Sequence, residues 1–258
     1  MLASNKFFPK TAYDCFERGL ALSRDKPCLG RRPWDAHKRD WATKLEFETY
    51  AQVAGRRDRI ASALRELAKR GVLGHDHVQS DPGAPFMVGI QTVNRPEWQV
   101  VAQACHAQSL AIVSLYDTLG KDTVEYCIQH SECRVVFATQ PHIPDLIRLA
   151  AKCSSMKAIV AIDPFDDAGA GNGNPNLVKG GSVLKQWANA AGLELYDWTE
   201  CALLTLSSSH TRRLTTHLFD QSRRSARSMS TLTTLLLARR SARSATRRAR
   251  RATRRARS

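Results

Sequence analysis

The sequence predicts an α/β fold in which strands and helices alternate and the strands form a mostly parallel sheet. Short runs of consecutive apolar residues recur between Pro85 and Asp163, and segments with helical spacing of their apolar residues lie between them. Strands that are apolar on successive residues are expected where helices cover both faces of a sheet. Such alternation is typical of parallel β-α-β units with right-handed crossovers.

Four strands are predicted in this region. Each is an apolar run that ends at turn-forming or polar residues, as at Asn94-Arg95-Pro96 after the first run and Asp163-Pro164 after the last. The predicted strands cover residues 86–90, 110–115, 133–138 and 156–162.

Three helices are predicted between these strands, at residues 97–108, 122–130 and 143–152. For the first, Asn94 is the expected N-cap and Pro96 suits the first turn. The side chains expected to share one face of this helix are Trp98, Val101, Ala102 and Cys105.

A long amphipathic helix is predicted upstream, over residues 49–70, with Gly71 at its C-cap. Downstream, residues 165–181 are rich in glycine and predict a loop, residues 183–191 a short helix and residues 193–196 a further strand. The long helix has an expected core stripe of Val53, Ile60, Leu64 and Leu67, and an expected solvated face of Arg56, Arg57, Arg59, Arg65 and Lys69.

The charge of the chain divides it near Glu200. The 258 residues carry a formal charge of +15, yet residues 1–200 hold 24 basic and 23 acidic residues. Residues 201–258 hold 15 Arg, no Lys and one acidic residue, Asp220, and therefore carry +14. We expect one globular domain at residues 1–200, which is long enough to bury a core. Residues 201–258 are expected to form a disordered, low-complexity Arg/Ser/Thr/Ala tail.

The tail has two interpretations. Arg-Arg-Ser-Ala-Arg-Ser and Ala-Thr-Arg-Arg-Ala-Arg each occur twice in it, and a disordered Arg-rich segment would bind polyanions such as nucleic acid or acidic lipid. Alternatively, the abrupt change of residue usage reflects a shifted reading frame or a mis-spliced gene. Translating the two other frames downstream of codon 200 tests that hypothesis.

The cysteines and the apolar segments bear on the compartment. Seven Cys are scattered without a Cys-x-x-Cys pair, and no apolar run approaches the length of a signal-peptide core or a membrane span. We therefore expect an intracellular protein with free thiols and no transmembrane segment.

Several stretches resemble a known family. Gly89-Ile90, Asn94-Arg95-Pro96-Glu97-Trp98 and Leu115-Tyr116-Asp117-Thr118-Leu119-Gly120 are similar to the long-chain acyl-CoA synthetases (long-chain fatty acid–CoA ligases) of the adenylate-forming, AMP-binding superfamily. The resemblance runs from about Thr11 to Glu200 and implies the first part of the family's large N-terminal domain. Supporting matches are Leu29-Gly30-Arg31-Arg32, Glu48-Thr49-Tyr50-Ala51-Gln52-Val53 and Leu195-Tyr196-Asp197-Trp198.

The resemblance implies a chemistry. Such enzymes use ATP and Mg²⁺ to convert a fatty acid to an acyl-adenylate, release pyrophosphate and transfer the acyl group to coenzyme A. It also implies a cytoplasmic location or association with the peroxisome or the endoplasmic reticulum. Fatty acid, ATP and coenzyme A are the implied partners.

The family's phosphate-binding loop has no counterpart after Glu200. Such a loop is rich in Ser, Thr and Gly and is followed by Lys, because backbone N–H groups and a cation hold the phosphates. Ser207-Ser208-Ser209 supplies hydroxyls without Gly or Lys. We therefore expect no catalytic, cofactor-binding or metal-binding residue in this chain, no bound cofactor and no activity of the chain alone.

Five features imitate functional motifs. Gly169-Ala170-Gly171-Asn172-Gly173 resembles a phosphate loop, but Lys179 precedes Gly180-Gly181-Ser182 in the wrong order, so we favour a surface loop. His75-Asp76-His77 lacks a third ligand cluster, and we expect a solvated turn rather than a metal site.

The other three features lie in or beside the predicted β-α units. Cys105 and His106 are adjacent in a predicted helix and point about 100° apart, which favours a buried Cys over a nucleophile–base pair. Trp98 is expected in the core rather than under a ligand. Asp163, Asp166 and Asp167 could bind a cation, but a charged turn is favoured.

Overall fold

The computed structural model describes residues 8–35, 37–73, 85–116, 120–165 and 180–204. Within these ranges the centre of the fold is a five-stranded sheet in the order β6-β5-β7-β8-β9. All four neighbouring pairs are parallel, so the predicted α/β class is confirmed. The strands are β5 (Met87–Gln91), β6 (Ala111–Ser114), β7 (Val135–Ala138), β8 (Ala158–Ala161) and β9 (Glu194–Asp197).

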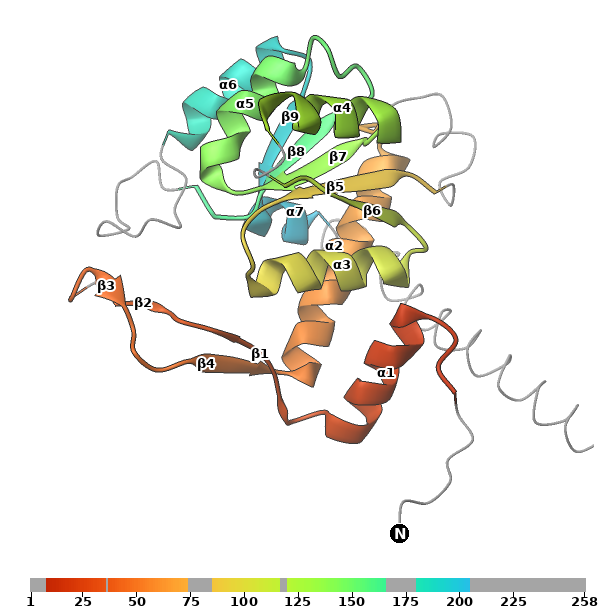
Figure 1. The fold of residues 1–258 in the computed structure, drawn as a ribbon, viewed down its shortest axis with the longest axis vertical. Helices are drawn as coiled ribbons and strands as arrows, with labels where there is room; N and C mark the ends of the chain where they lie inside the picture. The colour runs from red at the N-terminus through yellow and green to blue at the C-terminus, as the bar shows by residue number, and fades with distance from the viewer. Residues whose placement is uncertain (1–7, 36, 74–84, 117–119, 166–179, 205–258) are drawn as a thin grey trace, which may run out of the picture. The chain divides into compact units, whose positions relative to one another are not determined.

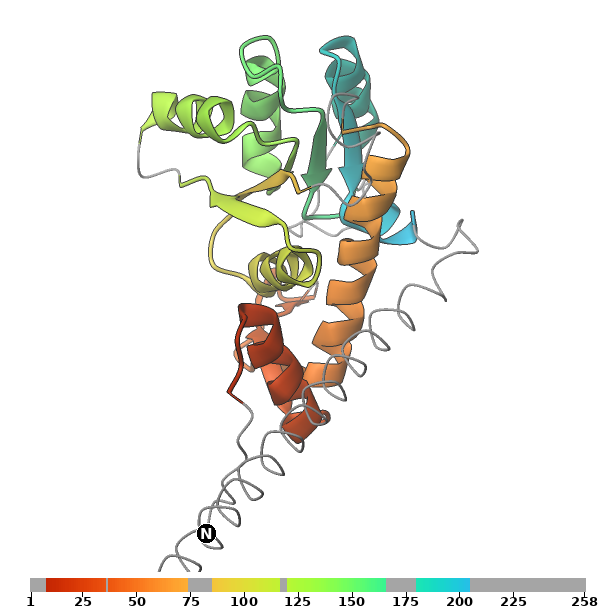
Figure 2. The same ribbon diagram turned by 90° about the vertical axis from the view of Figure 1, so that its right-hand side faces the viewer.

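Helices cover both faces of the sheet (Figures 1 and 2). Val135 and Phe137 of β7 belong to a core that includes helices α2, α3 and α7, whereas Val136 and Ala138 belong to a core that includes α4 and α5. This alternation follows from the two-residue period of a strand and explains why the strands are apolar throughout. The helices are α2 (Tyr50–Lys69), α3 (Pro96–Ala107), α4 (Lys121–Ser131), α5 (Ile143–Leu149), α6 (Gly181–Ala190) and α7 (Trp198–Leu203), and a 3₁₀ turn, η2 (Gln140–His142), precedes α5.

The strand order creates a switch point in the sheet. The chain leaves β5 through α3 to reach β6 on one side, and later places β7 on the other side of β5. Helices α3 and α5, which follow β5 and β7, therefore belong to different core clusters. In open α/β sheets the carboxyl ends of strands at such a point form the usual ligand crevice.

Helix α2 spans Tyr50–Lys69, one residue shorter at each end than predicted, and its C-cap is Arg70 rather than Gly71. Thr49 is its N-cap, and the Thr49 and Gln52 side chains bond reciprocally to each other's backbone N–H in a capping box. At the other end Gly71 has φ +74° and donates to the Ala68 carbonyl, while Val72 donates to that of Leu67. This is a Schellman motif, in which glycine accepts a left-handed conformation at low cost.

The buried side of α2 is only partly as predicted. The expected stripe of Val53, Ile60, Leu64 and Leu67 is buried. The expected solvated face is wrong for Arg65, which is half-buried and donates to Gln108. It is also wrong for Arg57, which is 4% exposed, and for Arg56, which is half-buried in ion pairs. Both guanidiniums lie against carboxylates of other elements, and this compensates for their removal from water.

Helix α3 begins one residue before the expected position. Its N-cap is Arg95, without a side-chain cap bond, so the expectation that Asn94 caps the helix is wrong. Pro96 occupies the first helical turn as predicted, where its missing N–H costs nothing.

The N-terminal elements are not predicted by the apolar pattern. Helix α1 (Ala12–Ser23) precedes two short antiparallel ribbons, β1 (Pro27–Arg31) with β4 (Glu46–Thr49) and β2 (Trp34–Asp35) with β3 (Asp40–Trp41). We call residues 27–49 the arm. Figure 1 shows its two ribbons separate from the parallel sheet.

Helix α7 crosses the expected domain boundary. It spans Trp198–Leu203 and buries Cys201 in the core, so regular structure continues beyond Glu200. The two-domain division and the character of residues 205–258 lie outside the described residues and stay predictions. Among the helices that the structure describes, none has the length and apolar character needed to cross a membrane.

Candidate functional site

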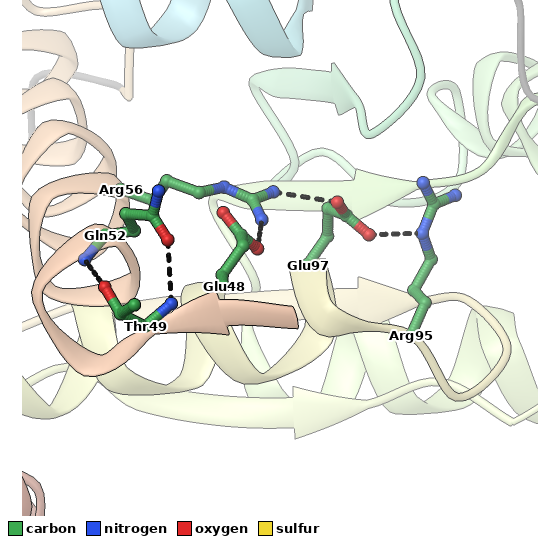
Figure 3. Close-up of polar contacts among 6 residues, drawn as sticks. All are labelled: Glu48, Thr49, Gln52, Arg56, Arg95 and Glu97. Carbon is green, nitrogen blue, oxygen red and sulfur yellow. Dashed lines mark hydrogen bonds and ion pairs between the residues drawn. The ribbon is translucent and has the colours of Figure 1, made fainter. Parts of the chain in front are cut away.

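A chain of alternating charges lies beside the start of α3. Arg56 donates to Glu48 and to Glu97 Oε1 (2.8 Å), and Arg95 donates from Nε to Glu97 Oε2 (2.7 Å) and from Nη1 to Asp163 Oδ1 (2.8 Å). Figure 3 shows Glu97 held between the two guanidiniums. We call Glu48, Arg56, Glu97, Arg95 and Asp163 the charge ladder.

Four separate parts of the fold supply the ladder. Glu48 comes from β4, Arg56 from α2 and Glu97 from the first turn of α3, just after β5, while Asp163 follows β8. Because β7 lies between β5 and β8, the Arg95–Asp163 pair links the segments that follow two strands on either side of a third. Glu97 also suits the positive end of the α3 dipole.

Burial and pairing act against each other in the ladder. Burial raises the pKa of the Glu97 carboxyl, but Arg95 and Arg56 outweigh it and the pKa is lowered. Burial also lowers the pKa of Arg95, and the carboxylates of Glu97 and Asp163 outweigh this and raise it. For Asp163 burial dominates over Arg95, so its pKa is raised. Glu97 is therefore a firmly ionised anion between two cations.

The aromatic and capping residues of the last described segment adjoin the ladder. The Arg56 guanidinium carbon lies 5.4 Å from the centroid of the Trp198 ring, which in turn packs edge-on against Phe137 of β7. Asp197 caps α7 in a reciprocal box with Glu200. The stretches that carry the resemblance, around Glu48, Arg95–Trp98 and Asp197–Trp198, therefore come together in space.

The carboxyl end of β5 also holds an unusual hydroxyl. Thr92 directly follows the strand, and its Oγ1 is buried without a hydrogen-bond partner among the described residues. A buried polar atom of this kind is uncommon and marks a place where a ligand or water is expected. With the strand-order switch, it identifies this end of the sheet as the candidate ligand-binding edge.

Several residues singled out from the sequence have structural roles. Cys105 is fully buried, and burial raises the pKa of its thiol to about 12, which agrees with an inert core cysteine. Trp98 packs against the core as expected. The favoured charged turn is wrong for Asp163, which is 3% exposed, because Arg95 from the start of α3 pairs with it.

The remaining candidates lie outside the described residues: His75 to His77, Asp166 and Asp167, Gly169 to Gly173, and Ser207 to Ser209. Within the ranges that are described, no three His, Cys, Asp or Glu side chains are grouped to hold a metal. The expectation that the chain carries no catalytic, cofactor-binding or metal-binding residue stays a prediction.

The sequence alone did not identify the ladder. Arg56 was expected in solvent, and Glu48, Arg95 and Glu97 were notable only as members of motifs. The one sequence feature that could have indicated the ladder is the position of these charged residues, directly beside apolar segments that are buried in the fold. Because each guanidinium of the ladder binds two carboxylates, the ladder fixes the segments around the candidate ligand-binding edge.

Comparison with known proteins identifies similar sequences. Residues 28–243 of this chain match the family described as "AMP-binding enzyme". The peroxisomal "Acyl-CoA ligase 891" of Penicillium brevicompactum is 38% identical over 156 residues, which are 60% of this chain and 21% of that protein. Its namesake in Penicillium roqueforti is 34% identical over 198 residues, or 77% of this chain and 26% of the relative. "Long-chain-fatty-acid--CoA ligase 1" of Homo sapiens is 33% identical over 158 residues, which are 60% of this chain and 20% of that protein.

The chain spans about a fifth to a quarter of the length of these curated relatives. Among solved structures, the A-PCP didomain of a carboxylic acid reductase from Segniliparus rugosus, in complex with AMP, matches with a TM-score of 0.60. The identity is 15%, and the match covers 76% of this chain and 27% of that one, so the likeness shows the fold alone.

Proposed function

Because the chain belongs to the AMP-binding enzyme family, we propose that it forms part of a long-chain fatty acid–CoA ligase. The proposed activity of the complete enzyme is ATP-dependent activation of a long-chain fatty acid through an acyl-adenylate, followed by transfer to coenzyme A. Mg²⁺ would accompany the ATP. The names of the mammalian relatives support the substrate class.

One observation carries the proposal. Residues from the separated stretches that resemble long-chain ligases, Glu48, Arg95 and Glu97, join in one charge ladder with Trp198 against it. The Arg95–Asp163 pair connects these segments to the carboxyl ends of β5 and β8, where α/β sheets bind ligands. We infer that this part of the enzyme is the scaffold of the adenylate-binding edge.

We further propose that the 258-residue chain does not catalyse the reaction by itself. Stabilising the phosphates of ATP requires convergent N–H donors and cations. The hydroxyl-rich Ser207-Ser208-Ser209 is followed by His and Thr rather than by Gly and Lys. The ladder cations cannot replace them, because Arg56 and Arg95 already bind carboxylates.

A chimera tests whether this chain can serve as the scaffold of such an enzyme. Residues 28–204 would replace the matching segment of a long-chain fatty acid–CoA ligase relative, and fatty acid-dependent ATP–pyrophosphate exchange would be measured. We expect the chimera to be active with long-chain acids. Glu97→Gln should lower its exchange rate roughly tenfold or more, because small displacements of the groups that position a substrate slow the reaction. Val183→Ser, on the exposed side of α6, is the matched control and should leave the rate unchanged. A folded chimera that lacks exchange would contradict the proposal.

The relatives also suggest a location. Because the fungal relatives are named as peroxisomal, we propose association with the peroxisome or the endoplasmic reticulum. Imaging of a tagged chain beside markers of both organelles tests this. A signal spread evenly through the cytoplasm would contradict it.

The Arg-rich segment supports a second candidate function. With 15 Arg and a single acidic residue, residues 201–258 would bind nucleic acid or acidic lipid by releasing counterions. We expect RNA binding by the whole chain that weakens steeply with added salt and disappears when residues 205–258 are deleted. Unchanged binding after the deletion would exclude this function.

A further inference from the structure

The tip of the arm is locally cationic. Residues 31–45, from the last residue of β1 to the residue before β4, contain five Arg or Lys against two Asp, a formal charge of +3, and Glu46, the register partner of Arg31, follows directly. All five cations are exposed, and the Lys38–Asp35 ion pair is long (3.7 Å) and solvated. The five are Arg31, Arg32, Lys38, Arg39 and Lys44.

Apolar side chains are exposed beside these cations. Trp41 is 39% exposed, Leu45 53% and Phe47 55%. Phe47 lies over Gly30, its register partner, where an added Cβ would come within 2.7 Å of the ring. Trp34 packs edge-on against Trp41 with centroids 5.4 Å apart. None of these large side chains belongs to either core cluster of the described fold.

We propose that the tip of the arm binds the surface of an anionic phospholipid bilayer, with Trp41 and Leu45 entering the headgroup region. Trp is favoured at the membrane–water interface, and aliphatic side chains add apolar burial there. The surrounding Lys and Arg side chains complement the phosphate and carboxylate groups of acidic lipids.

The shape and charge of the tip favour a bilayer over other partners. A two-stranded ribbon offers a narrow surface, while a stable protein interface needs about 800 Å² from each partner. Binding to nucleic acid would gain from Arg and Lys but nothing from Leu45. A bilayer accepts both the cations and the aliphatic side chain.

Residues 201–258 would also attract acidic vesicles, so the experiment must separate the two. Attraction of the Arg-rich segment is electrostatic and is screened at high ionic strength. Insertion of Trp41 and Leu45 is apolar and persists there. A fluorescence signal from Trp41 in high salt therefore reports the arm.

The first test measures tryptophan quenching in the full 258-residue chain. Vesicles of phosphatidylcholine and phosphatidylserine that contain brominated acyl chains are added at high salt. We expect quenching of the wild-type chain, its clear reduction in Trp41→Phe, where only Trp34 remains in the tip, and its retention in Trp187→Phe, because Trp187 is similarly exposed (37%) but lies on α6. Equal quenching of Trp41→Phe and wild type, or no quenching of wild type, would overturn the proposal.

The second test measures affinity by vesicle sedimentation, again at high salt, where attraction by residues 201–258 is screened. Leu45→Ser should weaken binding by roughly tenfold through lost apolar burial. Leu22→Ser, at a more exposed leucine of α1, should not change it. Circular dichroism would confirm that both variants fold. If Leu45→Ser binds vesicles as tightly as wild type, the arm is not a membrane site and the proposal is wrong. If Leu45→Ser instead loses self-association and keeps vesicle binding, the tip binds a second copy of the chain, which also contradicts the proposal.

Discussion

The Arg95 guanidinium donates a 2.8 Å hydrogen bond to the carboxylate of Asp163, although 68 residues separate them in the chain. This pair joins the start of α3 to the segment that follows β8. Arg95 simultaneously binds Glu97, so one cation fixes the entrance of a helix and the exit of a strand. The ladder thus determines the geometry of the sheet edge at which we place ligand binding.

Glu97 should be the most sensitive member of the ladder. Glu97→Gln leaves two half-buried guanidiniums with one carboxylate fewer, and we expect a loss of about 3 kcal/mol in the free energy of unfolding. Urea denaturation measures it. Glu46→Gln, at an exposed position of β4, is the control and should change stability by less than about 0.5 kcal/mol. Equal effects of the two variants would show that the ladder is energetically unimportant.

The ladder should also affect the pH dependence of stability, with opposite signs for Glu97 and Asp163. The pKa of Glu97 is lowered in the folded protein, so its contribution is present above the unfolded pKa and is lost as pH falls through the folded pKa. The pKa of Asp163 is raised, so its contribution is present below the unfolded pKa and is lost as pH rises through the folded pKa.

Two variants separate these contributions. Denaturation measured from acidic to neutral pH should show a weaker decline toward acid in Glu97→Gln than in wild type. Asp163→Asn should instead remove a decline that accompanies rising pH. The same pH profile in all three proteins would refute the assignment.

Arg57 should stabilise the contact between α1 and α2. It binds Glu17 of α1 and Asp58, and its guanidinium carbon lies 5.3 Å and 5.1 Å from the ring centroids of Tyr13 and Phe16. We expect Arg57→Ala to lower the free energy of unfolding by about 2 kcal/mol, because it removes the ion pairs and the aromatic contacts of the buried guanidinium. Thermal unfolding of Arg59→Ala, an exposed position on the same helix, provides the comparison and should match wild type.

Two glycines should respond oppositely to alanine. An added Cβ at Gly181 would lie 2.4 Å from Cγ of Phe165, so Gly181→Ala should destabilise the protein. Gly55 lies inside α2 with open space around it, so Gly55→Ala should stabilise by about 1 kcal/mol through helix propensity. Chemical denaturation of both variants checks the prediction, and a change of the same sign in both would contradict it.

The apolar pattern predicted the parallel sheet well because its strands are buried on both faces. Runs such as Val135–Ala138 have no other plausible placement, and the helices between them differ from prediction mainly at their ends. The arm could not be predicted in this way. Its strands are two to five residues long and largely exposed, so neither a run nor an alternation of apolar residues marks them.

The candidate site was harder to predict for a related reason. Charged residues on a helix are normally solvated, and only the approach of β4 and α3 to α2 makes Arg56 an exception. Asp163 similarly gains its partner from a segment 68 residues away. Pairings at such sequence separations depend on tertiary structure, which local spacing does not specify.

The central claim is that this chain provides a scaffold of a fatty acid-activating domain without its catalytic groups. Fatty acid-dependent ATP–pyrophosphate exchange by the purified 258-residue chain, with Mg²⁺ and a long-chain fatty acid, tests it most directly. We predict no exchange above a sample without protein, while a complete long-chain fatty acid–CoA ligase assayed in parallel is active. Exchange that depends on both the chain and the fatty acid would contradict the account.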